Sequence, residues 1–147
     1  MPDFTFRRAC EGDVPEICRI RLAVTENRLS DPRRVPPELV REYLLERGRG
    51  WVCARGDRLL GFSIGDLRSK SIWALFVEPG AEDLGIGSRL LELAVAWLRS
   101  EGVRLISLST QPGTRAERFY RARGWLVEGW CANGDLKLVL PVAGQDA

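Results

Sequence analysis

Along the chain, apolar residues recur either at every second position or at every third to fourth position, which predicts strands and helices respectively. The strand patterns cover Phe4–Arg8, Trp51–Arg55, Leu59–Leu67, Ser71–Val77, Leu105–Thr110, Trp125–Trp130 and Asp135–Pro141. The helical patterns run from Asp13 to Asn27, over Glu38–Arg47, from the glycines at 85 and 87 to Gly102, and from Thr114 to Ala122. The predicted order is β-α-α-β-β-β-α-β-α-β-β. It indicates one α/β domain over residues 1–147, with strands of mixed direction.

Capping and turn residues set the predicted boundaries. Asp13 is predicted to cap the first helix, with Pro15 in its first turn and Glu16 three residues after the cap. Gly48 and Gly50 are predicted to end the second helix, and Thr114 to cap the last one. The predicted turns lie at Gly56-Asp57, Arg68–Lys70, Pro112-Gly113 and Asn133-Gly134, and Asn27–Pro37 is predicted to be a loop.

The most informative stretch is Val77–Leu91, V-E-P-G-A-E-D-L-G-I-G-S-R-L-L. A predicted strand enters it, Gly85 and Gly87 follow, and an apolar helix then begins. The first backbone N–H groups of a helix lack intrahelical partners and carry a partial positive charge. Glycines allow an anion to approach that backbone, so the stretch predicts a phosphate cradle. No Lys follows Gly87 and the third glycine is missing, so neither a P-loop nor a dinucleotide fingerprint fits.

Composition excludes several classes of function. The 147 residues are 45% hydrophobic and 29% charged, with a net charge of +2, which is ordinary for a globular domain and argues against a nucleic-acid partner. No apolar run reaches the ~20 residues of a membrane span, and no signal-peptide core opens the chain. The sequence contains no His, and its four Cys have no CxxC spacing, so we expect no metal site and a cytoplasmic protein with reduced thiols.

Two segments together resemble the GNAT superfamily of acyl-CoA-dependent N-acyltransferases. The first is V-x-P followed by G-I-G-S-R-L-L, and the second is A-E-R-F-Y-R-A-R-G-W, Ala116–Trp125. They lie about 40 residues apart in the order expected for that family, and the resemblance covers nearly the whole chain. It implies a mixed, mostly antiparallel sheet flanked by helices, and transfer of an acetyl group from acetyl-CoA to an amine.

The resemblance also implies residue roles. The amides of Leu84, Gly85, Ile86, Gly87 and Ser88 would hold the CoA diphosphate. The strand segment Leu75, Phe76 and Val77 would splay from the next strand and pair with the pantetheine arm. The Leu75 amide would face the acetyl carbonyl, and Tyr120 would protonate the leaving thiolate. The two glycines also fit plain helix packing, and Tyr120 also fits a core position.

The chain departs from the family pattern at Glu82 and Asp83, where Arg or Gln and then often Gly usually stand. Ionised carboxylates repel phosphate, so we expect this pair to weaken cofactor binding. It also supports an alternative function, a catalytically inactive binding or regulatory module that keeps the fold.

The acceptor is expected to be a small-molecule or peptide amine, and the sequence leaves a homodimer open. The candidate bases for deprotonating that amine are Glu26, Glu78 and Glu128, or a water chain. The Asn27–Pro37 loop and the second helix are predicted to form the acceptor wall. Arg28, Arg33 and Arg34 in that loop fit either a solvated face or an anion clamp.

Overall fold

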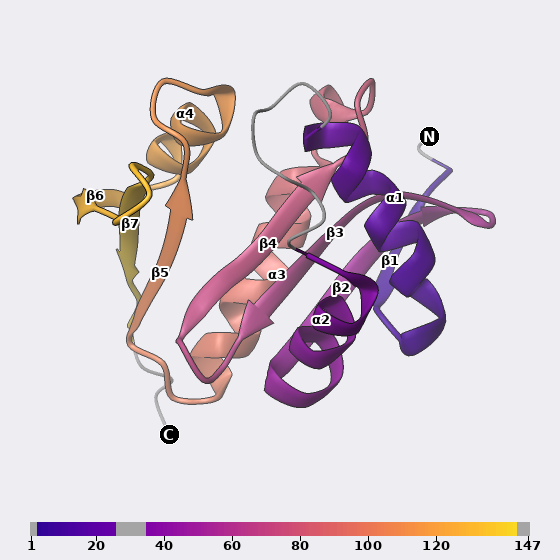
Figure 1. Ribbon diagram of the computed structural model, residues 1–147, viewed down its shortest axis with the longest axis horizontal. Helices are drawn as coiled ribbons and strands as arrows, with labels where there is room; N and C mark the ends of the chain where they lie inside the picture. Colours follow the sequence, from indigo (N-terminus) through magenta and orange to yellow (C-terminus); the bar gives the residue numbers. More distant parts are fainter. Residues whose placement is uncertain (1–2, 26–34, 144–147) are drawn as a thin grey trace.

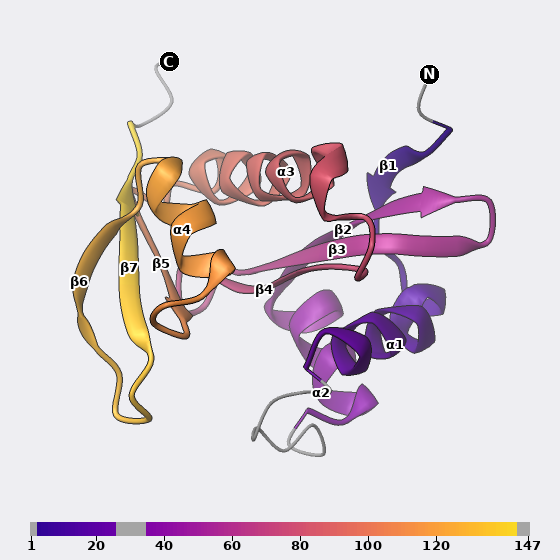
Figure 2. The same cartoon turned by 90° about the horizontal axis from the view of Figure 1, so that it is seen from above.

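The computed structural model describes residues 3–25 and 35–143, in which helices cover both faces of a seven-stranded sheet (Figures 1 and 2). The strands are β1 Thr5–Arg8, β2 Gly48–Arg55, β3 Arg58–Asp66, β4 Ser71–Val77, β5 Leu105–Thr110, β6 Leu126–Trp130 and β7 Leu136–Pro141. The α-helices are α1 Val14–Thr25, α2 Pro37–Arg41, α3 Ile86–Ser100 and α4 Arg115–Ala122. Short 3-10 turns cover Glu11–Asp13 and Glu82–Leu84, and a π-helical segment covers Glu42–Arg47. The predicted α/β order is confirmed.

The sheet order is β1-β2-β3-β4-β5-β7-β6, and neighbouring strands are antiparallel except for β4 and β5. Within the described part of the chain, β4 and β5 pair at a single register position, Ser71 opposite Ser107. Beyond that point the two parallel strands diverge, and the gap between them is visible in Figure 1. This divergence, expected from the resemblance, splits the sheet into two parts at the carboxyl ends of β4 and β5.

Two helical layers enclose the sheet. Helices α3 and α4 lie on one face, and α1 and α2 lie on the other (Figure 2). The predicted apolar stripe of α3 is buried in one core cluster through Leu90, Leu91, Ala94 and Leu98. The stripe of α1 is buried in the second cluster through Val14, Ile17 and Ile20. Each helix therefore covers the sheet with the face that its periodicity predicts.

The first α-helix begins at Val14, directly after Asp13 as predicted, but the predicted capping role of Asp13 is wrong. A 3-10 turn precedes α1 and is capped by Cys10, so Asp13 lies inside the helical run. Its carboxylate accepts a 2.8 Å hydrogen bond from the Cys10 backbone N–H and two 2.8 Å bonds from Arg7. Asp13 thus reaches back to the start of the run, in the way that the third residue of a capping box does.

The second helical run ends at Arg47 with Gly48 as its C-cap, as predicted, but the predicted strand start at Trp51 is wrong, because β2 already begins at Gly48. A Cβ on Gly48 would lie 1.7 Å from the Gly65 carbonyl oxygen, and one on Gly50 would lie 2.5 Å from Leu44. Both glycines therefore permit close packing at the start of the strand, where the sequence pattern alone suggests a helix stop.

Other boundaries agree with the predictions. The hydroxyl of Thr114 caps α4 by accepting from the Glu117 backbone N–H at 3.2 Å. Glu117 in turn accepts a 2.7 Å bond from the Gly113 N–H. Most of the predicted Asn27–Pro37 loop, with its three arginines, lies outside the described residues.

Candidate functional site

A cleft of about 590 Å³ opens where β4 diverges from β5. Its walls come from β4, the loop before α3, the first turn of α3, and α4, with one residue of α1. The lining residues are Val24, Leu75, Phe76, Val77, Pro79, Glu82, Asp83, Gly85, Gly87, Ser88, Thr114, Arg115, Ala116, Phe119, Tyr120 and Arg123. The cleft thus brings together most of the predicted site residues. Leu84 and Ile86 do not line it: Leu84 is half-exposed and Ile86 is fully buried.

The backbone of β4 is directed into this cleft at two residues. The N–H of Glu78 donates to the Leu60 carbonyl of β3 at 2.8 Å. Because successive backbone groups of a strand point to opposite neighbours, Phe76 also faces β3, whereas Leu75 and Val77 face away from it. On that other side β5 has already diverged. The N–H and C=O groups of Leu75 and Val77 are therefore free of strand partners among the described residues.

The first turn of α3 forms the opposite wall. Gly85 is its N-cap with φ of 79°, a conformation that favours glycine, and no side chain of the described residues caps this end. The Gly85 carbonyl accepts the first hydrogen bond of the helix, from the Arg89 N–H at 3.3 Å. The N–H groups of residues 86–88 come before this bond and have no partner within the helix. Such a helix end binds anions. The predicted strand, glycine turn and helix start are all observed.

The acidic pair beside the cradle is less repulsive than the sequence suggests. Asp83 forms a 2.7 Å ion pair with Arg115 of α4. Glu82 accepts a 2.8 Å hydrogen bond from the Gly80 backbone N–H. One of the two negative charges is therefore offset by an arginine that lines the same cleft.

Sequence reasoning missed a second arginine. Arg123 donates to the Ser88 hydroxyl from Nε at 3.1 Å and from Nη2 at 2.5 Å, and its Nη1 donates to the Phe119 carbonyl at 3.0 Å. Its guanidinium lies 3.8 Å from the centre of the Phe119 ring. The signal that could have found both arginines is the spacing of Arg115, Phe119 and Arg123 at i, i+4 and i+8, which places them along one side of α4.

Tyr120 lies at the cleft wall with its ring packed in the core. It is 7% exposed and makes edge contacts with Phe119 and Trp125 at centroid distances of 5.3 and 5.8 Å. Burial disfavours the phenolate and raises the pKa of Tyr120 well above its ordinary value. The side chain is therefore a protonated phenol near neutral pH. The two alternatives for Tyr120, a core residue and a cleft residue, therefore both hold: its ring packs in the core and it also lines the cleft.

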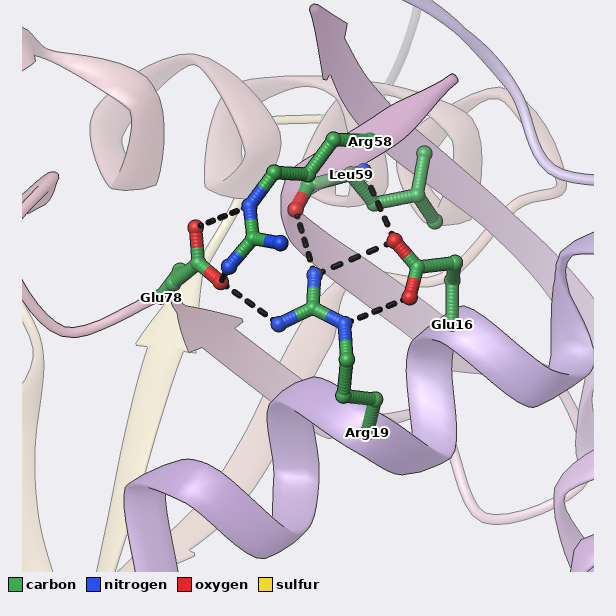
Figure 3. A network of polar contacts seen from close by, with 5 residues as sticks. All are labelled: Glu16, Arg19, Arg58, Leu59 and Glu78. Atoms are coloured by element: carbon green, nitrogen blue, oxygen red, sulfur yellow. Dashed lines mark hydrogen bonds and ion pairs between the residues drawn. The ribbon is translucent and has the colours of Figure 1, made fainter.

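Glu78 is poorly suited to act as the general base. It lies between Arg19 of α1 and Arg58 of β3, and Arg19 also pairs with Glu16 and donates to the Leu59 carbonyl (Figure 3). Burial alone would raise the pKa of Glu78. The hydrogen bonds and charges of the two arginines outweigh that effect, and the pKa lies below its usual range. This network ties α1 to the carboxyl end of β4.

The other candidate bases are not placed at the cleft by the structure. Glu128 forms a 2.9 Å ion pair with Lys137 on the β6–β7 hairpin and does not line the cleft. Glu26 lies outside the described residues, as do Arg28, Arg33 and Arg34. Val24 shows that the end of α1 reaches the cleft wall.

Within residues 3–25 and 35–143, no helix has the length and apolar character needed to span a membrane. The same residues contain no cluster of three or more His, Cys, Asp or Glu side chains placed to bind a metal ion.

Comparison with known proteins agrees with this geometry. A rice (Oryza sativa subsp. japonica) protein named serotonin N-acetyltransferase 2, chloroplastic, is 39% identical over 57 residues, 39% of this chain and 28% of that protein. An uncharacterized N-acetyltransferase ycf52-like of Prochlorococcus marinus is 30% identical over 74 residues, 48% of this chain and 40% of that protein. The matches thus span less than half of either relative.

The fold recurs in a crystal structure of the PaiA N-acetyltransferase of Thermoplasma acidophilum in complex with coenzyme A. The TM-score is 0.81 at 16% identity, covering 96% of this chain and 100% of that one. The sequence pattern of the acetyltransferase (GNAT) family matches residues 16–125, from α1 through the cradle to the end of α4. That match includes both segments that carry the resemblance, and the chain belongs to the acetyltransferase (GNAT) family.

Proposed function

We propose that this protein is an N-acetyltransferase that binds acetyl-CoA in the cleft and transfers the acetyl group to an amine. The diphosphate lies against the N–H groups of residues 84–88, and the pantetheine arm runs along β4. The acetyl group lies near Leu75, with the sulfur near Tyr120. The amine approaches from the side of Val24 and the end of α1.

The observation that carries this proposal is the pairing of two unsatisfied backbone surfaces across one cleft. The β4 groups at Leu75 and Val77 lack a strand partner among the described residues, and the start of α3 lacks a side-chain cap among them. A ligand with amide groups at one end and a diphosphate at the other satisfies both surfaces. Acetyl-CoA has this arrangement, and the apolar walls suit its pantetheine arm.

In the proposed reaction the amine nitrogen attacks the thioester carbonyl directly. The Leu75 N–H donates to the carbonyl oxygen as negative charge develops there, which lowers the barrier. A C–N bond forms and the C–S bond breaks. The expelled thiolate takes a proton from the Tyr120 hydroxyl, which recovers one from solvent. The amine loses its proton to water. Glu78 is a weak base because its two arginine partners lower its pKa. The cleft-lining carboxylates of the described residues, Glu82 and Asp83, lie beside the cradle and not beside the acetyl group.

An inactive binding module is the alternative, and the acidic pair at 82 and 83 is its main support. The Asp83–Arg115 ion pair weakens that support, because it offsets one of the charges that would repel phosphate. The two functions separate in one experiment. The enzyme gives heat on titration with acetyl-CoA and releases CoA when an amine is added, whereas the inactive module releases no CoA, whether or not the titration gives heat.

The decisive assay measures CoA release with a free-thiol reagent over a panel of amines. The panel includes an arylalkylamine such as serotonin, because the rice relative carries that substrate in its name, together with N-terminal peptides, a lysine peptide and polyamines. Release that requires an amine, and mass addition of one acetyl group to it, supports the proposal. Binding of acetyl-CoA without release for any amine in the panel favours the binding module.

A further inference from the structure

The loop before the cradle carries negative charge, whereas its proposed ligand, a diphosphate, is itself negatively charged. A helix N-terminus offers a diphosphate only a partial positive charge, and arginine side chains bind phosphate more strongly through charge-assisted hydrogen bonds. Glu82 and Asp83 lie three and two positions before Gly85, and both are exposed acidic side chains. The loop therefore contributes negative charge at the place where the ligand needs positive charge.

Arg123 supplies positive charge at the cradle from another element. Two of its nitrogens donate to the hydroxyl of Ser88, a residue of the first turn of α3. Its third nitrogen donates to the Phe119 carbonyl, and the guanidinium lies against the Phe119 ring. These contacts hold the planar group in one place at the cleft wall, so little entropy is lost when it also binds a ligand.

Arg115 lies on the same side of α4, two turns earlier. Its present partner is Asp83, and the two side chains are 63% and 91% exposed. An ion pair so exposed contributes little to stability. A diphosphate offers more negative charge and a geometry that suits a guanidinium fork. Arg115 can therefore exchange Asp83 for a phosphate at low cost.

We propose that Arg115 and Arg123 form an arginine clamp for the CoA diphosphate, replacing the positive charge that the loop before Gly85 lacks. The inference rests on the proposed function, since it names further binding residues at the same cleft. In it, Asp83 holds Arg115 in the free protein and releases it when the ligand binds.

The test is calorimetric titration of the whole protein with CoA and with 3′-dephospho-CoA. The variants are Arg115→Gln, Arg123→Gln and Arg123→Lys. The matched control is Arg118→Gln, which removes the same charge from an exposed position of the same helix outside the cleft lining. A melting curve for each variant confirms folding.

Because a charge-assisted hydrogen bond contributes more than a neutral one and these sites are exposed, we expect each Gln variant to raise Kd about 5- to 10-fold. Arg123→Lys should fall between wild type and Arg123→Gln. The same ratios are expected with 3′-dephospho-CoA, which keeps the diphosphate, and Arg118→Gln should bind like wild type. Losses in the clamp variants should shrink at high salt.

If the Arg115 and Arg123 variants bind CoA with the same Kd as wild type and Arg118→Gln, the clamp is overturned and the proposed function is not. Losses that vanish with 3′-dephospho-CoA overturn the diphosphate assignment. A wild-type protein that binds no CoA at all overturns the proposed function, and the clamp with it.

A double-mutant cycle tests the exchange at Asp83. If Asp83 competes for Arg115, Asp83→Asn should tighten CoA binding about 3-fold in wild type, the gain from weakening one exposed ion pair. It should have a smaller effect in Arg115→Gln. A larger gain in the Arg115→Gln background would show plain repulsion and would overturn the exchange.

Discussion

Substituting Gly87 by Ala separates ligand binding from folding at the cradle. Gly87 is the second residue of α3, and φ there is not positive. A Cβ built on it lies 3.5 Å from Val77 and from Phe119, which is ordinary contact distance, so the methyl group fits without displacing either. By contrast Gly85 has φ of 79°, where any side chain is strained. Gly87→Ala is therefore the cleaner test.

The two effects of Gly87→Ala should have opposite signs. Ala is favoured over Gly in a helix by up to about 1 kcal/mol, so Tm should stay equal or rise by about 2–4 °C. The methyl group faces the cleft, where it would keep the diphosphate from the N–H groups of the first turn. Losing one charge-assisted hydrogen bond costs about 1.5–3 kcal/mol, so Kd for acetyl-CoA should rise roughly 10- to 100-fold.

The assay pairs thermal unfolding followed by circular dichroism with calorimetric titration. Gly129→Ala on β6 is the control, since a Cβ there meets no atom within 4 Å and the residue does not line the cleft. It should leave Kd unchanged. A folded Gly87→Ala protein with wild-type affinity would refute the reasoning, and Gly87 would then be a packing glycine.

Three further predictions concern single groups. Tyr120→Phe should keep Tm and Kd but lower kcat roughly 100-fold, because the proton donor is lost; full kcat would leave Tyr120 a packing residue. Glu78→Gln should lower Tm by about 2–4 °C, since Arg19 and Arg58 lose a charged partner, while the pH profile of kcat keeps its shape; loss of its acidic limb, where a general base becomes protonated, would identify Glu78 as the base. The hydrogen bond from Arg7 lowers the pKa of Asp13, so its stabilisation is present above pH ~4 and disappears as pH falls through the lowered value. Asp13→Asn should therefore cost about 1–2 kcal/mol at pH 7, and unfolding curves should converge with wild type in acid; a constant difference down to pH ~2 would contradict this.

The periodic parts of the fold could be predicted from the sequence because each element buries the face that its own pattern marks. Ser71–Val77 and Leu105–Thr110 are found with the predicted bounds, and Thr114 caps α4 as expected. The errors occur where a distant segment decides the local structure. Gly48 is a strand residue because Gly65 packs against it, and the pattern around residue 48 carries no trace of residue 65.

The candidate site shows the same division. The cradle is a local feature, with strand, glycines and helix contiguous in sequence, so it could be identified directly. The contacts of Arg115 with Asp83 and of Arg123 with Ser88 join residues more than 30 positions apart. Glu78 is a candidate base in the sequence because nothing there shows that Arg19, 59 positions away, pairs with it. The charged partners that set a pKa or a binding affinity here are distant in sequence and are brought together only by the tertiary fold.

The central claim is that acetyl-CoA binds between the unpaired backbone of β4 and the start of α3. The most direct measurement is titration of the ¹⁵N-labelled protein with acetyl-CoA, followed by amide chemical shifts. The largest changes are predicted at the amides of Leu75 and Val77 and of residues 85–88, with smaller changes on α4 and none on β1. Saturable binding that leaves the amides of β4 and the first turn of α3 unmoved would contradict the account.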